Sequence, residues 1–119
     1  MDRLVLGTCD RLFLAMNVVG VGMARGECHA IRKSVFLAVD GYDESLAAGE
    51  DFDLFRRIAT WGRRTRAARV RFLWNWVIWE DPRRYRQRGY ARTMLDWFRN
   101  TVMITFFGRS HSSVWEPIR

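Results

Sequence analysis

The amino-acid sequence predicts a helix-rich α/β fold. Three stretches, 10–21, 50–62 and 82–107, repeat apolar residues at the three-to-four-residue spacing of an amphipathic helix. Two shorter stretches, 27–32 and 70–78, alternate apolar and polar residues as half-buried strands do. With 119 residues, the chain has room for one domain with a single modest core.

The first predicted helix begins at Asp10, whose carboxylate suits the N-cap position, and ends before Gly20. The strand at 27–32 follows, with Cys28 and Ala30 on one side and polar residues mainly on the other. The apolar face of the predicted helix at 10–21 consists of Leu12, Phe13, Met16 and Val19.

A short helical turn and a longer helix are predicted next. Ser34 suits the N-cap of a turn that runs to Val39 and ends at the pair Asp40-Gly41. We expect a loop over 43–49, followed by the helix at 50–62 with Gly62 as its C-terminal cap. The apolar face of this helix consists of Leu54, Phe55, Ile58 and Trp61.

The second half of the chain predicts a strand and a long helix. The strand at 70–78 is inferred from apolar residues at every second position. Asp81 and Pro82 form a typical helix start, and Gly108 a typical helix end. The apolar face of this helix is made by Leu95, Phe98, Val102 and Phe106.

The charge of the chain is strongly positive and is carried almost entirely by arginine. The formal net charge is +7, and Lys33 is the only lysine. Because guanidinium groups bind phosphates and carboxylates through a planar fork, we expect an anionic partner, namely a nucleotide diphosphate, a nucleic acid or an acidic lipid headgroup. A coding bias toward arginine explains the same composition, and both explanations stay open.

Cysteine usage and the start of the sequence give no sign of secretion. Cys9 and Cys28 are too few for a disulfide framework and lack metal-ligand spacing. No apolar stretch before Cys9 is long enough for the core of a signal peptide. We therefore expect reduced cysteines and a cytoplasmic location.

Three motifs follow one another between residues 26 and 57. They are the strand-like 26–33, which ends in two basic residues, the Asp-Gly-Tyr-Asp-Glu turn at 40–44, and the Gly-Glu-Asp-Phe-Asp-Leu helix start at 49–54. This order and spacing resemble family 2 glycosyltransferases of the GT-A type. The resemblance implies that residues 1–81 are the C-terminal, acceptor-side part of a GT-A catalytic domain, without its N-terminal nucleotide-binding half. One departure is Asp40, which stands where the family has a first glycine.

The resemblance also implies a reaction, the inverting transfer of a sugar from a nucleotide-sugar to a hydroxyl of a carbohydrate or lipid-linked acceptor. Asp51 stands at the position of the catalytic base, which takes the proton of that hydroxyl. The remaining acidic residues of the motifs are candidates for acceptor binding: Asp43, Glu44, Glu50 and Asp53. The alternative is that acidic residues in a first helical turn only stabilise its free N–H groups and the helix dipole.

A divalent metal, Mg²⁺ or Mn²⁺, is implied for the complete enzyme, with ligands mostly outside this chain. Asp51-Phe52-Asp53 spells the Asp-x-Asp pattern of such metal sites, but we reject it because the pair falls in a helix rather than in a loop after a strand. No histidine lies between Gly62 and Pro82, so a histidine ligand is not predicted. His29 and His111 stand alone in the sequence, and we expect packed or surface residues there.

Residues 82–119 form a second predicted part, a basic amphipathic helix and tail. Four arginines in its first half are candidates for binding an anion or a membrane: Arg83, Arg84, Arg86 and Arg88. Such a helix either lies on an anionic membrane, at its inner face for a cytoplasmic enzyme, or docks on the missing half. Alone, the chain is expected to be inactive and to self-associate through uncovered apolar surface.

A different class of protein explains the same charge and aromatic content. An arginine-rich and aromatic-rich module binds nucleic acid or anionic membranes by charge and stacking. This alternative gives no reason for the turn at 40–44 or for the helix start at 49–54, and no zinc-finger, basic-zipper or RNA-recognition signature is present. Nucleic acid is therefore the less favoured partner.

Overall fold

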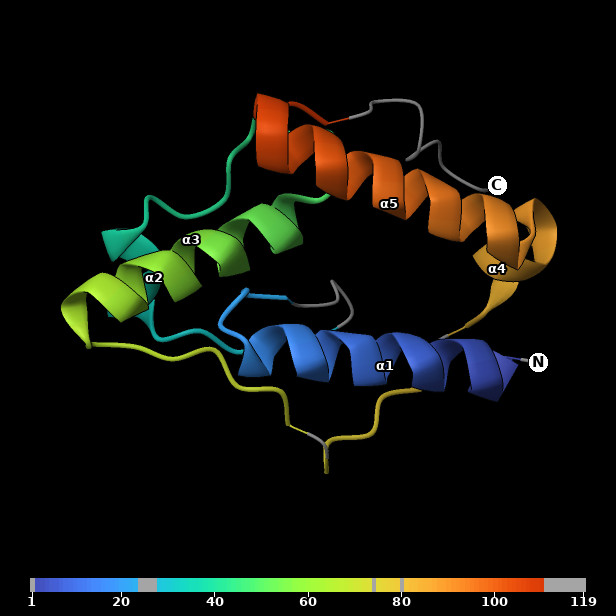
Figure 1. Ribbon diagram of the computed structural model, residues 1–119, viewed down its shortest axis with the longest axis horizontal. Coiled ribbons are helices and arrows are strands. Elements are labelled where there is room, and N and C mark those ends of the chain that lie inside the picture. Colours follow the sequence, from blue (N-terminus) through green and yellow to red (C-terminus); the bar gives the residue numbers. More distant parts are fainter. Residues whose placement is uncertain (1, 24–27, 74, 80, 111–119) are drawn as a thin grey trace.

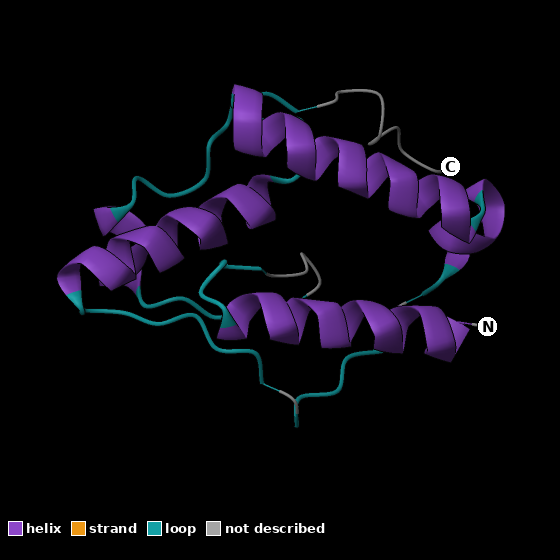
Figure 2. Cartoon of the chain, viewed as in Figure 1, coloured by secondary structure: helices purple, strands orange, loops and turns teal. Residues whose placement is uncertain are grey.

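The computed structural model describes residues 2–23, 28–73, 75–79 and 81–110 (Figure 1). Over these ranges the chain forms α-helices and no strand (Figure 2). The helix-rich part of the predicted fold class is confirmed, whereas an α/β sheet is not shown. The helices are α1 (Asp2–Val18), α2 (Lys33–Ala38), α3 (Glu50–Thr65), α4 (Arg83–Arg88) and α5 (Tyr90–Phe107).

Helix α1 is longer than predicted, because it begins at Asp2 rather than at Asp10. Gly7 therefore lies within the helix. Its end is held by Asn17, whose side-chain amide donates to the carbonyl of Met23 at 2.8 Å and accepts from the Met23 N–H at 3.1 Å. These two bonds fold the chain back sharply after the helix. The predicted N-cap Asp10 instead lies in mid-helix.

The α2–α3 pair carries one of the hydrophobic clusters. Val35 and Val39 pack against Leu54 and Ile58 of α3. Helix α3 continues past Gly62 to Thr65 and is capped by Arg66 in the left-handed conformation, at φ 57°. Gly62 serves close packing instead, since a Cβ there would lie 2.3 Å from the carbonyl oxygen of Ala68.

A second cluster joins α5 to the loop that leads into α3. Ile104 of α5 packs with Leu46 and Phe52, and it is only 2% exposed. At the same place the hydroxyl of Ser110 accepts a hydrogen bond from the Ala47 N–H at 2.9 Å. Helix α5 therefore fixes the loop at 43–49 and, with it, the start of α3.

The predicted helix at 82–107 is wrong as one continuous element. Gly89 adopts φ 84° and ψ 142°, which separates α4 from α5. The two helices pack against each other through Tyr85, whose ring stacks on Tyr90 at 5.4 Å and meets the edge of Trp97 at 5.8 Å. The predicted start and end are confirmed within one residue, because α4 begins after Pro82 and α5 ends at Gly108.

Both predicted strands are wrong over the residues described. Residues 28–32 lead into α2 without strand pairing, and the described residues of 70–78 are irregular. A strand requires a neighbour to receive its N–H and C=O groups, and the described part of the chain offers none. None of the helices in these ranges has the length and hydropathy needed to cross a bilayer.

Candidate functional site

The predicted catalytic motif opens α3. Gly49 adopts the left-handed conformation at φ 81°, and Glu50, Asp51 and Asp53 occupy the first turn. Three acidic residues therefore lie in the first turn of α3, at the positive end of the helix dipole. The predicted helix start near Glu50 or Asp51 is confirmed, since α3 begins at Glu50.

Asp51 is half-buried at this helix start. One of its carboxylate oxygens accepts a hydrogen bond from the Phe52 N–H at 2.7 Å. Tyr42, from the turn before the loop, lies within the electrostatic reach of Asp51 and Glu50. Burial raises the pKa of Tyr42 above its ordinary value of 10.0, and the charges of Asp51 and Glu50 raise it further.

His29 completes this group, although it was expected to stand alone. Its Nε2 lies 2.5 Å from the hydroxyl of Tyr42, and its ring meets Phe55 edge to face at 5.1 Å. The prediction of a packed histidine is confirmed, whereas its apparent isolation is not.

Asp53 faces away from solvent and is held by arginines. It is 6% exposed, and its two oxygens accept from Arg57 at 2.6 Å and from Arg56 at 3.1 Å. Arg57 also donates to the carbonyls of Val39 and Gly41, the latter at 2.7 Å. These contacts give Asp53 a structural role, because they fasten α3 to the turn after α2. Its predicted contact with an acceptor stays a prediction.

Asp43 and Glu44 are exposed in the loop before α3. Asp43 accepts from the hydroxyl of Ser45 at 2.6 Å and from its N–H at 3.0 Å. These hydrogen bonds hold the pKa of Asp43 below its ordinary value. Both carboxylates are accessible to an acceptor, but Asp43 already shapes its own turn.

The residues present do not fit a divalent metal. Over the described ranges, no three His, Cys, Asp or Glu side chains gather in a group that could hold an ion. Asp51 and Asp53 lie in one helix, and the carboxylate of Asp53 is engaged by Arg56 and Arg57. His111 lies outside the described residues.

The predicted anion-binding arginines lie on α4. Arg83 is exposed, and its Nε lies 3.8 Å from Asp81, whose carboxylate also accepts the Arg83 N–H at 2.9 Å. Arg86 is exposed and Arg88 is half-buried, while the side chain of Arg84 lies outside the described part. Helix α4 lies beside the N-terminal end of α5 in Figure 1, away from the start of α3.

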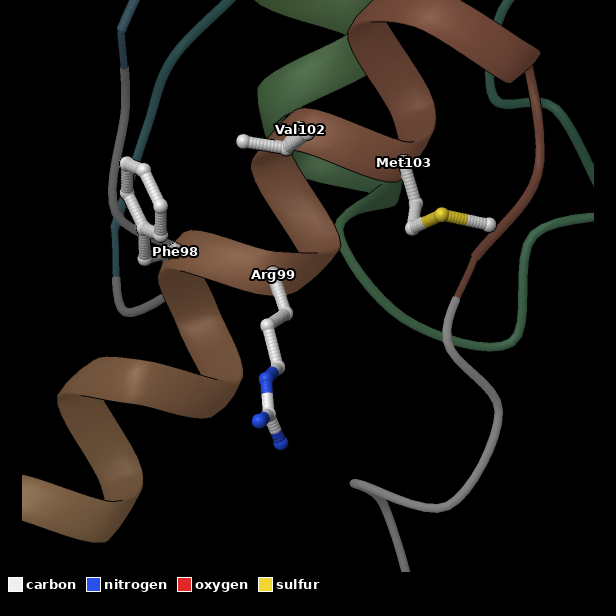
Figure 3. Close-up of a pocket in the computed structure, with 4 residues that line it drawn as sticks. All are labelled: Phe98, Arg99, Val102 and Met103. Atoms are coloured by element: carbon white, nitrogen blue, oxygen red, sulfur yellow. The ribbon is translucent and has the colours of Figure 1, made fainter.

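Helix α5 carries a shallow hollow of about 290 Å³ on its outer side. Phe98 and Val102 point to one side of it, Met103 to the other, and Arg99 projects between them (Figure 3). The hollow is almost wholly apolar and includes none of the predicted acidic residues.

No protein-family model, curated protein or solved structure matches this chain. The resemblance to family 2 glycosyltransferases therefore rests on the order of the motifs in the sequence.

Proposed function

We propose that this chain is the acceptor-side part of an inverting family 2 glycosyltransferase of the GT-A type, with Asp51 as its general base. The observation that carries the proposal is the meeting of two motifs that are separated in sequence. Arg57 of α3 donates to the carbonyl of Gly41 in the turn at 40–44, and the charges of Asp51 and Glu50 at the start of α3 raise the pKa of Tyr42 in that turn.

The proposed chemistry follows from the half-buried carboxylate of Asp51, which is held in the first turn of α3. An acceptor hydroxyl placed beside Asp51 donates its proton to the carboxylate as its oxygen attacks the anomeric carbon. The nucleotide diphosphate leaves from the opposite face of the sugar, which inverts the anomeric configuration. A base held in hydrogen-bond reach contributes typically about 10²–10⁴-fold. Exposed Asp43 and Glu44 are placed to accept hydrogen bonds from other acceptor hydroxyls.

The proposal assigns the nucleotide pocket and its divalent metal to a part outside the described residues. It therefore separates donor binding from acceptor activation. The purified chain, titrated calorimetrically with nucleotide-sugars and Mn²⁺, should give no binding heat.

Membranes and extracts of cells that produce the protein, supplied with labelled nucleotide-sugars, should form a product that cells lacking it do not form. Micromolar, metal-dependent binding of a nucleotide-sugar by the purified chain would contradict the assignment of donor binding to another part. Identical product profiles with and without the protein would contradict the function.

A further inference from the structure

Exposed apolar side chains gather along one edge of the molecule. Helix α1 and the segment 69–79 both lie along the lower edge of Figure 1, opposite α5. We call this the aromatic edge and define it by the outer face of α1 and by residues 69–73 and 75–79, which are the described residues of the segment. It takes no part in the proposed catalytic group, and it is independent of that proposal.

The outer face of α1 is apolar where solvent would favour polar residues. Leu4 and Val18 are each 78% exposed, and they recur with Arg11 and Ala15 at helical spacing. Phe13, on the opposite side of the helix, is buried against the rest of the chain. Leu4 and Val18 are therefore exposed near the two ends of a helix face that also carries Thr8, Arg11 and Ala15.

Segment 69–79 adds exposed tryptophans to this edge. Trp79 is 90% exposed and Trp76 62%, and Val77 and Ile78 beside them are exposed as well. Trp61 and Trp97 are half-buried by comparison. Indole rings favour the boundary between lipid and water, where the ring enters the apolar layer and the N–H stays near water.

The charge of this edge selects an anionic surface. Arg69 and Arg71 are exposed just before the tryptophans, and Arg11 lies within the stripe of α1. Arginine stems lie along apolar surface while their guanidinium groups reach the phosphates of a headgroup layer. The exposed apolar residues on the outer face of α5 include no exposed tryptophan in the described part of the chain. This face is therefore the weaker candidate for contact with a membrane.

We propose that the aromatic edge binds the surface of an anionic lipid bilayer, with Trp76 and Trp79 entering the headgroup region and the arginines contacting lipid phosphates. The contact is peripheral, since the apolar side chains belong to a helix face and a loop. It differs from the membrane contact expected from the sequence, which placed it on the helix after Pro82.

The test uses the purified chain and vesicles of phosphatidylcholine, with or without an equal part of phosphatidylglycerol. The chain should sediment with the anionic vesicles only, and its tryptophan emission should shift to the blue. Trp76→Ser with Trp79→Ser should weaken partitioning by roughly tenfold or more. Arg69→Gln and Arg71→Gln should each weaken it by roughly fivefold.

A matched control replaces two equally exposed aromatics on α5, Phe98→Ser with Phe106→Ser, and should leave partitioning unchanged. Circular dichroism verifies that each variant stays folded, and the arginine variants test the edge independently of the tryptophans. The inference is overturned if the wild-type chain ignores anionic vesicles at low salt, or if the α5 control loses as much binding as the tryptophan variant. It is also overturned if sedimentation velocity shows that the tryptophan variant abolishes a dimer while vesicle binding is absent.

Discussion

At the scale of single residues, the contact between Asp53 and Arg57 determines how the site is held. Removing one partner of a buried ion pair costs more than the pair itself contributes, because the other charge stays buried. Arg57→Met should therefore lower the free energy of unfolding by about 3 kcal/mol, measured by urea denaturation. Arg56→Met, which removes the more exposed partner of the same carboxylate, should cost less than about 1 kcal/mol. Equal losses would show that Asp53 is not clamped as described.

Tyr42 reports the charge of Asp51 directly. Burial, then Asp51 and Glu50, raise the pKa of Tyr42 above 10.0, so folding favours the protonated phenol. The stability that this gives is present below pH 10.0 and is lost as the pH rises through the folded pKa. Asp51→Asn should move the pKa of Tyr42 downward, measured by tyrosinate absorbance with Tyr42→Phe as the reference.

The control for that titration is Asp40→Asn. Asp40 is exposed and adopts φ 61°, a conformation that asparagine tolerates. This variant should leave the Tyr42 titration unchanged. A pKa that does not respond to Asp51→Asn would separate the two side chains and remove the support for the site.

The sequence predicted that Asp51 lies in the first turn of α3, but it did not predict the contact between His29 and Tyr42. Asp51 was found because Glu-Asp stands in a motif at a helix start, which is a local signal. The contact of His29 with Tyr42 joins positions 13 residues apart across a fold. No spacing rule predicts such a contact, because packing on Phe55 decides where the imidazole lies.

At the scale of elements, Gly49 couples the start of α3 to α5. A Cβ at Gly49 would lie 2.5 Å from the Cδ1 of Ile104, and its φ of 81° is unfavourable for other residues. Gly49→Ala should cost about 3 kcal/mol from strain and overpacking together. Gly108→Ala, at a similar conformation but in open space, should cost about 1 kcal/mol. Thermal unfolding of both variants measures the difference, and equal costs would show that α5 does not press on Gly49.

The start of α3 and the two outer limits of the α4–α5 pair were predictable at this scale, whereas the start of α1, the end of α3 and strand pairing were not. Gly49, the Asp81-Pro82 pair and Gly108 mark the predicted limits through backbone conformation, which is a local property. The alternation at 70–78 reports only that these residues suit a pleated surface. Whether a strand forms depends on a neighbouring strand, which the described residues do not supply. Gly89 was overlooked because a single glycine in a helical pattern need not break it.

At the scale of the whole molecule, the two proposals concern different parts of the fold. Tyr42, Asp51 and His29 lie where α3 meets the turn after α2. The aromatic edge lies along α1 and the described residues of the segment 69–79. A transferase that acts on lipid-linked acceptors benefits from both, since one surface holds the membrane and another activates the hydroxyl. The exposed apolar residues are also consistent with the expectation from the sequence that the isolated chain self-associates.

The central claim is that Asp51 removes the proton of the acceptor hydroxyl. The most direct measurement is the rate of sugar transfer by the protein in its complete assembly, comparing wild type with Asp51→Asn and Asp40→Asn. Asp51→Asn should reduce kcat by roughly 10² or more, with the fold intact, whereas Asp40→Asn should retain the wild-type rate. Near-normal turnover of Asp51→Asn would contradict the account.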